Sequence, residues 1–251
     1  MFDTSEKNDV ERALIRHGYD RDMIETPYTF LAVRDAEKSI LVDAGAGSFA
    51  ESTGRLSENL EAVGIQRGDV TDVIITHAHP DHVGGTVDGD AKLTYPNATY
   101  YLNRMEWEYW WSDEAFETTK SSFVEFTRER LDVIKSSVTL CDGQTELFPG
   151  VTLIPAPGHT PGHCIVAFDS IGSSITYAAD TALTSLPLER PDWQPIFDVD
   201  RPRARRTKMD LARRAVDEEL LLMFQHFSPY PGIGRIEVLG SGWRWVSIDI
   251  E

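Results

Sequence analysis

The chain has 251 residues, a formal net charge of −17 and a sequence pI near 4.8. Nucleic acid and anionic membrane surfaces would repel such a chain at long range, which argues against either as the main partner. We expect a cytoplasmic protein with two free buried thiols, because no apolar run approaches the roughly 20 residues of a membrane span, the first residues lack a signal sequence, and Cys141 and Cys164 lie far apart in no paired motif.

The pattern of apolar runs predicts an α/β fold made of two sets of strands. No linker, short repeat or low-complexity stretch divides the chain, so we expect a single domain over residues 1–251. Predicted strands in the first half cover residues 28–34, 39–43, 72–76 and 99–102. Those in the second half cover residues 151–155, 165–168, 175–179 and 243–248. Two packed β-sheets with helices outside would accommodate both sets.

The third predicted strand leads into a dense group of metal-binding side chains. Residues 76–85 read Thr-His-Ala-His-Pro-Asp-His-Val-Gly-Gly. Three imidazoles and one carboxylate fall within six residues, namely His77, His79, Asp81 and His82. The apolar stretch 73–75 predicts a buried strand before them, and the Gly-Gly pair predicts a tight turn after them. The side chains would lie at the carboxyl end of a strand, where open active sites are usually built, and we predict a metal site there.

Three later predicted strands each end at one more candidate ligand. The run 151–154 leads into the Gly-His-Thr turn of His159, later runs end at Asp180 and at His226, and no cysteine joins the set. Five imidazoles and two carboxylates suit two divalent metal ions, zinc first, and also iron, manganese or cobalt. A carboxylate shared by two ions offsets their repulsion and leaves space for a bridging water, which metal coordination converts to hydroxide at neutral pH.

This order of residues resembles the metallo-β-lactamase superfamily of hydrolases, whose pattern is His-x-His-x-Asp-His, then a distant His, an Asp and a final His. All seven positions match in this chain. The resemblance implies that one metal ion is bound by His77, His79 and His159. It implies that a second is bound by Asp81, His82 and His226, and that Asp180 bridges both. It also implies an αββα sandwich, in which two mixed β-sheets are flanked by helices and the ligands lie along one edge.

Two further residues are predicted to support the metal site from behind. Asp43, within the run Leu-Val-Asp-Ala-Gly, resembles the family's early Asp-x-Gly turn, and a plain turn-forming aspartate is the alternative. His163 lies four residues after His159 and beside the apolar run 164–166. We expect His163 to brace the turn or a ligand, and not to bind metal itself.

Substrate contacts must come from segments near the metals, and two candidates precede the last ligand. The first is the aromatic segment 107–126, although aromatic residues at helical spacing are as often core. Its members include Trp107, Trp110 and Phe123. The second is the proline-broken segment 183–198, which follows Asp180 and carries Trp193. Such a loop could cover an active site, and a rigid connection is the alternative.

A third candidate wall directly follows His226. It carries Phe227 and Tyr230, each with aromatic packing as the alternative. The hydroxyl of Tyr230 could donate a hydrogen bond to a substrate oxygen. We assign the basic stretch 201–214 to the solvated face of a helix, because seven of its residues are Lys or Arg and the spacing is helical.

Details outside the ligands resemble the branch that contains acyl-homoserine lactonases and methyl-parathion-type phosphotriesterases. The segments that carry this likeness are Asp180-Thr181, Pro191-Asp192-Trp193 and His226-Phe227. β-Lactamases of the zinc type commonly place cysteine where this chain has Asp180. Glyoxalase II enzymes share the seven ligands, but their basic glutathione-binding tail is not found after His226.

The resemblance therefore implies a hydrolase that acts on a small molecule, with a lactone, an ester or a phosphotriester as the substrate class. A metal-bridging hydroxide would attack, and Asp81 or Asp180 would relay the proton to the leaving group. Two alternatives stay open, namely a glyoxalase II-like thioesterase and a non-enzymatic ligand-binding or regulatory member of the fold. The complete ligand set disfavours the second. A homodimer is compatible with the sequence.

Overall fold

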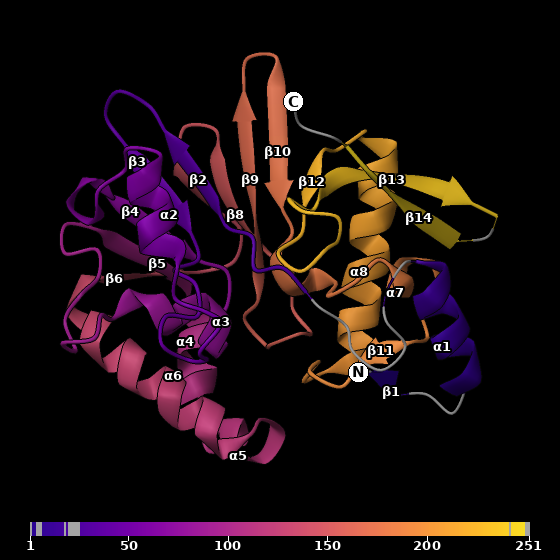
Figure 1. Ribbon diagram of the computed structural model, residues 1–251, viewed down its shortest axis with the longest axis horizontal. Helices are drawn as coiled ribbons and strands as arrows, with labels where there is room; N and C mark the ends of the chain where they lie inside the picture. The colour runs from indigo at the N-terminus through magenta and orange to yellow at the C-terminus, as the bar shows by residue number, and fades with distance from the viewer. Residues whose placement is uncertain (1, 4–6, 18, 20–25, 241, 249–251) are drawn as a thin grey trace.

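The computed structural model describes residues 2–3, 7–17, 19, 26–240 and 242–248. Two mixed β-sheets pack face to face, and helices cover their outer faces (Figure 1). The layers follow the order helix, sheet, sheet, helix, so the predicted α/β sandwich is confirmed. None of the described helices is long and apolar enough to cross a membrane.

The first half of the chain builds a five-stranded sheet in the order β2-β3-β4-β5-β6. β2 pairs antiparallel with β3, and the other neighbours are parallel. The strands are β2 (Leu31–Arg34), β3 (Ser39–Val42), β4 (Asp72–Ile75), β5 (Thr99–Asn103) and β6 (Val138–Cys141). The helices are α2 (Leu56–Ala62), α3 (Pro80–Val83), α4 (Arg104–Trp111), α5 (Glu114–Thr118) and α6 (Ser121–Ile134). Short 3₁₀ turns are η1 (Arg67–Asp69), η2 (Gly84–Thr86) and η3 (Lys135–Ser137).

The second half builds a seven-stranded sheet in the order β14-β13-β12-β10-β9-β8-β7. Its neighbours are antiparallel except β10 and β12, which are parallel. The strands are β7 (Thr145–Phe148), β8 (Val151–Pro155), β9 (Cys164–Ser170), β10 (Ser173–Tyr177), β12 (Leu222–Met223), β13 (Ile233–Leu239) and β14 (Gly242–Ser247). The helical segments are η4 (Ala179–Thr181), α7 (Leu186–Glu189) and α8 (Arg201–Asp217). The other described elements are α1 (Lys7–Arg16), β1 (Phe2–Asp3) and β11 (Gln194–Pro195).

The core lies in three layers, one between the sheets and one on each outer face. Ile74 of β4 packs between the sheets against residues of β8 and β9, whereas Val73 and Ile75 of the same strand pack against α4 and α6. The strand is therefore buried on both faces, which explains why it reads as a continuous apolar run and not as an alternating one. On the far side, the apolar face of α8 packs against Ile165 and Ala178.

Strand ends from both sheets meet at one edge of the sandwich. β10 and β12 run parallel with Tyr177 opposite Met223, so the segments that follow them leave the sheet side by side. The backbone N–H of Cys164 donates to the carbonyl oxygen of Thr76 at 2.9 Å, which ties the start of β9 to the end of β4. The segments after β4, before β9, after β10 and after β12 therefore converge, and these are the segments that carry the candidate ligands.

Candidate metal centre

The loop after β4 is held in place by close backbone contacts. Pro80 begins the short helix α3, where its fixed φ suits the first helical position. A Cβ atom on Gly84 would lie 2.1 Å from the backbone oxygen of Ala46, and one on Gly85 would lie 2.0 Å from that of Ala44. Only glycine permits this approach, which seats α3 against the loop that follows β3.

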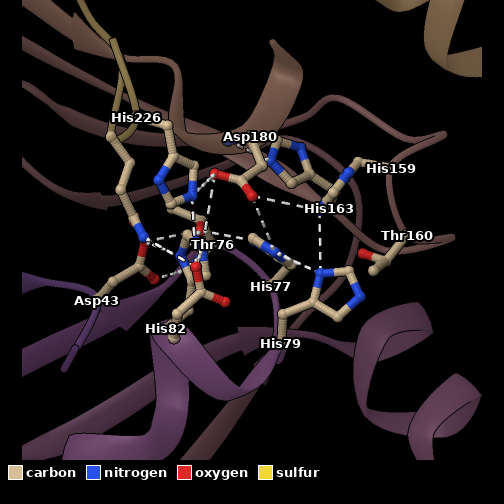
Figure 2. Close-up of polar contacts among 12 residues, drawn as sticks. Asp43, Thr76, His77, His79, His82, His159, Thr160, His163, Asp180 and His226 are labelled. Carbon is tan, nitrogen blue, oxygen red and sulfur yellow. Dashed lines mark hydrogen bonds and ion pairs between the residues drawn. The ribbon is translucent and has the colours of Figure 1, made fainter. Parts of the chain in front are cut away.

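Three histidines form the first cluster of candidate ligands. His77 Nε2 lies 3.0 Å from His79 Nδ1, and His79 Nδ1 lies 2.9 Å from His159 Nε2. All three side chains are buried, and their nitrogens point toward one another from two different loops (Figure 2). The arrangement offers three nitrogen lone pairs to one point, as the sequence predicts for the first metal ion.

The second cluster combines two carboxylates with two histidines. His226 Nε2 lies 3.3 Å from Asp81 Oδ2 and 3.4 Å from Asp180 Oδ1. His82 Nε2 lies 3.4 Å from the same oxygen of Asp180. The four side chains come from α3, from η4 and from the segment after β12, and their ligand atoms all lie within 4.8 Å of one another.

Asp180 faces both clusters at once. Its Oδ1 atom is directed at the second cluster, whereas Oδ2 lies 3.3 Å from His159 Nε2 and 3.9 Å from His77 Nε2. Figure 2 shows the carboxylate between the two groups of imidazoles. This is the geometry expected of a carboxylate that bridges two cations.

Burial and charge prepare these side chains for a cation. Burial lowers the pKa of His79 to about 3 and holds the pKa of His77 well below its ordinary value, so both rings are neutral and keep a free lone pair. Burial opposes the charge on Asp81, but the charge of His82 and the hydrogen bond with His226 outweigh it and lower the pKa of Asp81 to about 2. The site thus combines neutral imidazoles with ionised carboxylates.

The histidines beside the carboxylates behave differently. Burial disfavours the charged form of His159, but hydrogen bonds with Asp180 and Asp198 outweigh it and raise its pKa to about 9. In the same way, the charge of Asp180 overcomes burial and raises the pKa of His226 to about 10. Each of these rings presents Nε2 to a cluster, so a metal ion that binds there replaces a proton.

The spacing of the donors fits two metal ions. His82 Nε2 and Asp180 Oδ1 are buried and make no hydrogen bond among the described residues. Ligands at about 2.0–2.2 Å from a tetrahedral zinc ion lie roughly 3.3–3.6 Å apart. The separations of 3.3–3.7 Å in the second cluster are close to this value, whereas the nitrogens of the first cluster, at 2.9–3.0 Å, lie somewhat closer together. The residues therefore fit a dinuclear centre, and their nitrogen and oxygen donors do not by themselves select one metal.

Asp43 lies behind His82, where the sequence predicts a supporting residue. Its Oδ2 accepts a hydrogen bond from His82 Nδ1 at 2.7 Å and one from Thr76 Oγ1 at 2.8 Å, while its Oδ1 accepts from the Thr76 backbone N–H at 2.8 Å. Because His82 donates from Nδ1 in this bond, Nε2 is the nitrogen that faces the second cluster, and a metal ion that binds there replaces its proton.

Other ligands are oriented by similar hydrogen bonds. His159 Nδ1 donates to Asp198 Oδ1 at 2.9 Å, and His226 Nδ1 donates to the backbone oxygen of Pro27 at 3.1 Å. His163 uses both ring nitrogens away from the metals, because Nδ1 donates to the Ala156 carbonyl at 2.9 Å and Nε2 accepts from the Asp180 backbone N–H at 3.2 Å. This is the bracing position predicted for His163.

A cavity of about 290 Å³ opens directly onto the candidate ligands. Its polar side consists of His79, Asp81, His159, Asp180 and His226. The remaining walls are largely apolar and are formed by Thr26, Tyr28, Phe49, Pro80, Phe123, Leu183 and Phe197. A second cavity of about 680 Å³ shares Thr26, Tyr28 and Phe49 with the first and extends along the loop after β3.

The five aromatic residues predicted for the cavity walls lie elsewhere. Trp107 and Trp110 pack in the core between the five-stranded sheet and its helices, where Trp110 is fully buried and its ring centroid lies 5.5 Å from that of His79. Trp193 packs in a separate buried cluster with α1. These indoles face the core because their elements use the aromatic face for packing.

The two residues predicted after His226 are also outside the cavity. Phe227 is fully buried and stacks on Phe224, with ring centroids 4.1 Å apart. Tyr230 is 75% exposed and does not line the cavity. The predicted segments 107–126 and 183–198 do reach the cavity, but through Phe123, Leu183 and Phe197.

Three residues near the site have no signal in the sequence motifs. Tyr28 lines the cavity with its ring edge-on to His226, at a centroid distance of 5.1 Å. Asp198 supports His159, and Glu106 is a fully buried carboxylate on α4. An isolated acidic residue in a helix or loop is usually predicted to be solvent-exposed, and only the structure shows what these carboxylates contact.

A sandwich of two mixed sheets that gathers two His/Asp clusters at one edge defines a metal-dependent hydrolase. The sequence profile described as "Metallo-beta-lactamase superfamily" matches residues 25–226, so the chain belongs to this superfamily. The match spans every candidate ligand from His77 to His226.

Two curated relatives and one solved structure are similar to this chain. An N-acyl homoserine lactonase of Bacillus cereus is 24% identical over 226 residues, which cover 82% of this chain and 83% of the relative. One from Bacillus sp. is 26% identical over 162 residues, but this chain spans only 58% of its length. The structure of AidC, a dizinc quorum-quenching lactonase in complex with a product, superposes with a TM-score of 0.92 at 27% identity, covering 98% of this chain and 88% of that one.

Proposed function

We propose that this chain is a dinuclear metal-dependent lactonase and that N-acyl homoserine lactones are its substrates. The observation that carries the proposal is the shared carboxylate of Asp180, which joins the two clusters at the floor of an apolar cavity. The lactonase relatives and the likeness to a dizinc lactonase support the choice of substrate class. Zinc is the metal we propose, because five of the seven candidate ligands are imidazoles.

The reaction adds water to the ring carbonyl and breaks the acyl carbon–oxygen bond, so a lactone becomes a hydroxy acid. When bound, two divalent ions supply hydroxide at neutral pH and polarise the carbonyl oxygen. Asp81 is ionised and borders the cavity, with its side chain 18% exposed. We assign to Asp81 the transfer of the proton from the attacking water to the leaving alkoxide.

Tyr28 is placed to donate a hydrogen bond to the substrate. Burial, together with the charges of Asp81 and Asp180, raises the pKa of Tyr28 to about 12, so the hydroxyl stays protonated at neutral pH. It lines both cavities and lies beside His226 at the rim of the metal centre. An ester or amide oxygen held between the metals and this rim would accept its proton.

The apolar walls suit an acyl chain. Phe49 and Phe123 pack edge to face with ring centroids 5.4 Å apart, and Leu183 and Phe197 complete this side of the cavity. Each buried CH₂ group contributes about 0.8 kcal/mol, a factor of about four in affinity. We therefore expect longer acyl chains to raise kcat/KM until the chain fills the available space.

The test is proton release by the metal-loaded protein on a panel of substrates, each measured with and without chelator. The panel contains N-acyl homoserine lactones of increasing chain length, unsubstituted lactones, aryl esters, phosphotriesters and glutathione thioesters. We expect chelator-sensitive turnover that is highest for acylated lactones and rises with chain length. A preference for thioesters would replace the lactonase with the glyoxalase-like alternative, and turnover that survives complete metal removal would refute metal-dependent hydrolysis.

A further inference from the structure

Glu106 is a buried carboxylate that the proposed reaction does not use. It lies in the first turn of α4, is 0% exposed and makes no ion pair with a described Lys, Arg or His. Burial raises its pKa, while the hydrogen bonds that it accepts favour the ionised form. Burying a carboxyl group costs free energy unless its oxygens are fully hydrogen-bonded. The groups that donate hydrogen bonds to Glu106 therefore indicate its structural role.

Four donors surround this carboxylate, two on each oxygen. Oε1 accepts from the backbone N–H of Ala78 at 2.9 Å and from Trp110 Nε1 at 2.7 Å. Oε2 accepts from Thr160 Oγ1 at 2.6 Å and from the backbone N–H of Gly162 at 3.0 Å. One side chain thus links the loop after β4 to the loop before β9.

The surrounding backbone is shaped for this contact. A Cβ atom on Gly162 would lie 2.1 Å from the backbone nitrogen of Glu106, so only glycine lets the second loop approach α4 so closely. From the other side, Thr127 Oγ1 on α6 donates to the carbonyl oxygen of Ala78 at 2.8 Å. The residue between His77 and His79 is therefore held at both its N–H and its carbonyl.

All three histidines of the first cluster lie on the two loops that Glu106 links. Ala78 lies between His77 and His79, and Thr160 directly follows His159. The second cluster has supports of its own, since His82 is held by Asp43 and His226 by the backbone of Pro27. Glu106 hydrogen-bonds to no ligand directly, but two of its partners, Ala78 and Thr160, are chain neighbours of the first-cluster histidines.

We propose that Glu106 is the positioning residue of the first metal site, and that its carboxylate sets the distance between the His77–His79 loop and the His159 loop. The assignment rests on the proposed metal centre and is independent of the substrate. Loss of an outer-shell hydrogen bond typically weakens metal affinity by about 10- to 100-fold. This loss should fall on one ion only, because the supports of the second cluster are separate.

Glu106→Gln tests the assignment directly, because it replaces one acceptor oxygen of the carboxylate with a donor NH₂ group. Whichever way it is turned, the NH₂ group of a glutamine meets a backbone or indole N–H that needs an acceptor. Thr160→Val is a milder variant that removes one of the four donors and keeps the carboxylate. Glu108→Gln is the matched control, because it makes the same change at an exposed position of the same helix.

The measurement is titration of the metal-free variants with cobalt(II) against a competing chelator, followed by the visible spectrum of the bound ion. We expect two ions in the wild type and in Glu108→Gln. In Glu106→Gln we expect one ion to bind about 10- to 100-fold more weakly, with an altered spectrum, while the other is unchanged. Thr160→Val should show the same selective loss to a smaller degree.

Three outcomes would overturn the assignment or its basis. Equal binding of both ions by Glu106→Gln and the wild type would refute the positioning role. An equal weakening of both ions together with a lower unfolding temperature of the metal-free protein would also refute it, since that is the result of a general structural role. A wild-type chain that binds no cobalt and no zinc would instead refute the metal centre itself.

Discussion

Replacing Asp43 with Asn removes one charge behind His82 and leaves the shape of the side chain almost unchanged. Asp43 has a φ of 60°, in the left-handed region that Asn adopts more readily than most residues. The backbone therefore tolerates the substitution. The hydrogen bonds are not all kept, because Asp43 accepts three of them and the NH₂ group of Asn cannot accept any. The amide oxygen accepts either the bond from the Thr76 N–H at Oδ1 or the bonds from Thr76 Oγ1 and His82 Nδ1 at Oδ2.

The hydrogen-bond mismatch changes the protonation of the His82 imidazole. If the amide oxygen keeps the Thr76 N–H, the NH₂ group stands at the position of Oδ2, 2.7 Å from His82 Nδ1. Two donors cannot face each other, so the ring must accept at Nδ1 and carry its proton on Nε2, the atom that faces Asp81 and Asp180. A protonated Nε2 cannot bind metal. The expected loss of about 10- to 100-fold in affinity corresponds to about 1.4–2.8 kcal/mol.

The assay is the metal content of each variant after dialysis against a graded series of chelator concentrations. We expect Asp43→Asn to keep one ion under conditions where the wild type keeps two, with a parallel loss of turnover. Thr76→Val is the comparison variant, because it removes one hydroxyl donor and leaves the carboxylate to accept from His82. Since this hydroxyl also lies 3.2 Å from His77 Nδ1, any loss in this variant should fall on the first cluster and not on the second. If Asp43→Asn held both ions as tightly as the wild type, the tautomer argument would be wrong.

Three further predictions concern other side chains. Asp180→Asn removes the charge between the clusters. We expect this variant to lose one ion and its turnover to fall by more than about tenfold, which corresponds to about 1.4 kcal/mol. Unchanged metal content and rate would exclude the bridging role of Asp180. Tyr28→Phe should lower kcat/KM for lactones by about 2- to 12-fold, the equivalent of one hydrogen bond of about 0.5–1.5 kcal/mol, whereas Tyr230→Phe at an exposed site should have no effect. Burial raises the pKa of the thiols of Cys141 and Cys164. Neither thiol should therefore react with a thiol reagent at mildly alkaline pH until denaturant is added. Rapid labelling of the folded protein would contradict this expectation.

The sequence predicts strands in both sheets, from the buried central strands to the edge strands β2 and β14. Each of the eight predicted segments overlaps a strand of the structure, and the segment 151–155 matches β8 in full. Of the strands in these two sheets, β6, β7 and β13 lie outside the predicted segments, and β6 and β7 are each one of the two edge strands of their sheet. Edge strands bury fewer side chains, and four-residue segments with one exposed residue in their middle carry too little apolar pattern to stand out.

The candidate ligands were found from the sequence because each follows a buried strand, where a polar residue contrasts with its neighbours. The supporting carboxylates Asp198 and Glu106 lack this contrast, since Asp198 lies on a loop and Glu106 lies near the start of an aromatic helix that carries a second, exposed glutamate, Glu108. The aromatic prediction failed for a related reason. Spacing places Trp110 on one face of α4, but only the structure shows that this face packs in the core, where the indole N–H donates to Glu106 Oε1.

The same carboxylates explain why metal binding and folding should be linked in this protein. Two carboxylates, Asp81 and Asp180, lie within the clusters, and Asp43, Asp198 and Glu106 surround them. Buried charges of one sign are costly unless they are balanced, and without metal part of the balance comes from protonated imidazoles such as those of His159 and His226. Two divalent cations supply the opposite charge, and the three supporting carboxylates then hold the ligands in the orientation that the cations require. The free energy of metal binding therefore contributes to the stability of the fold.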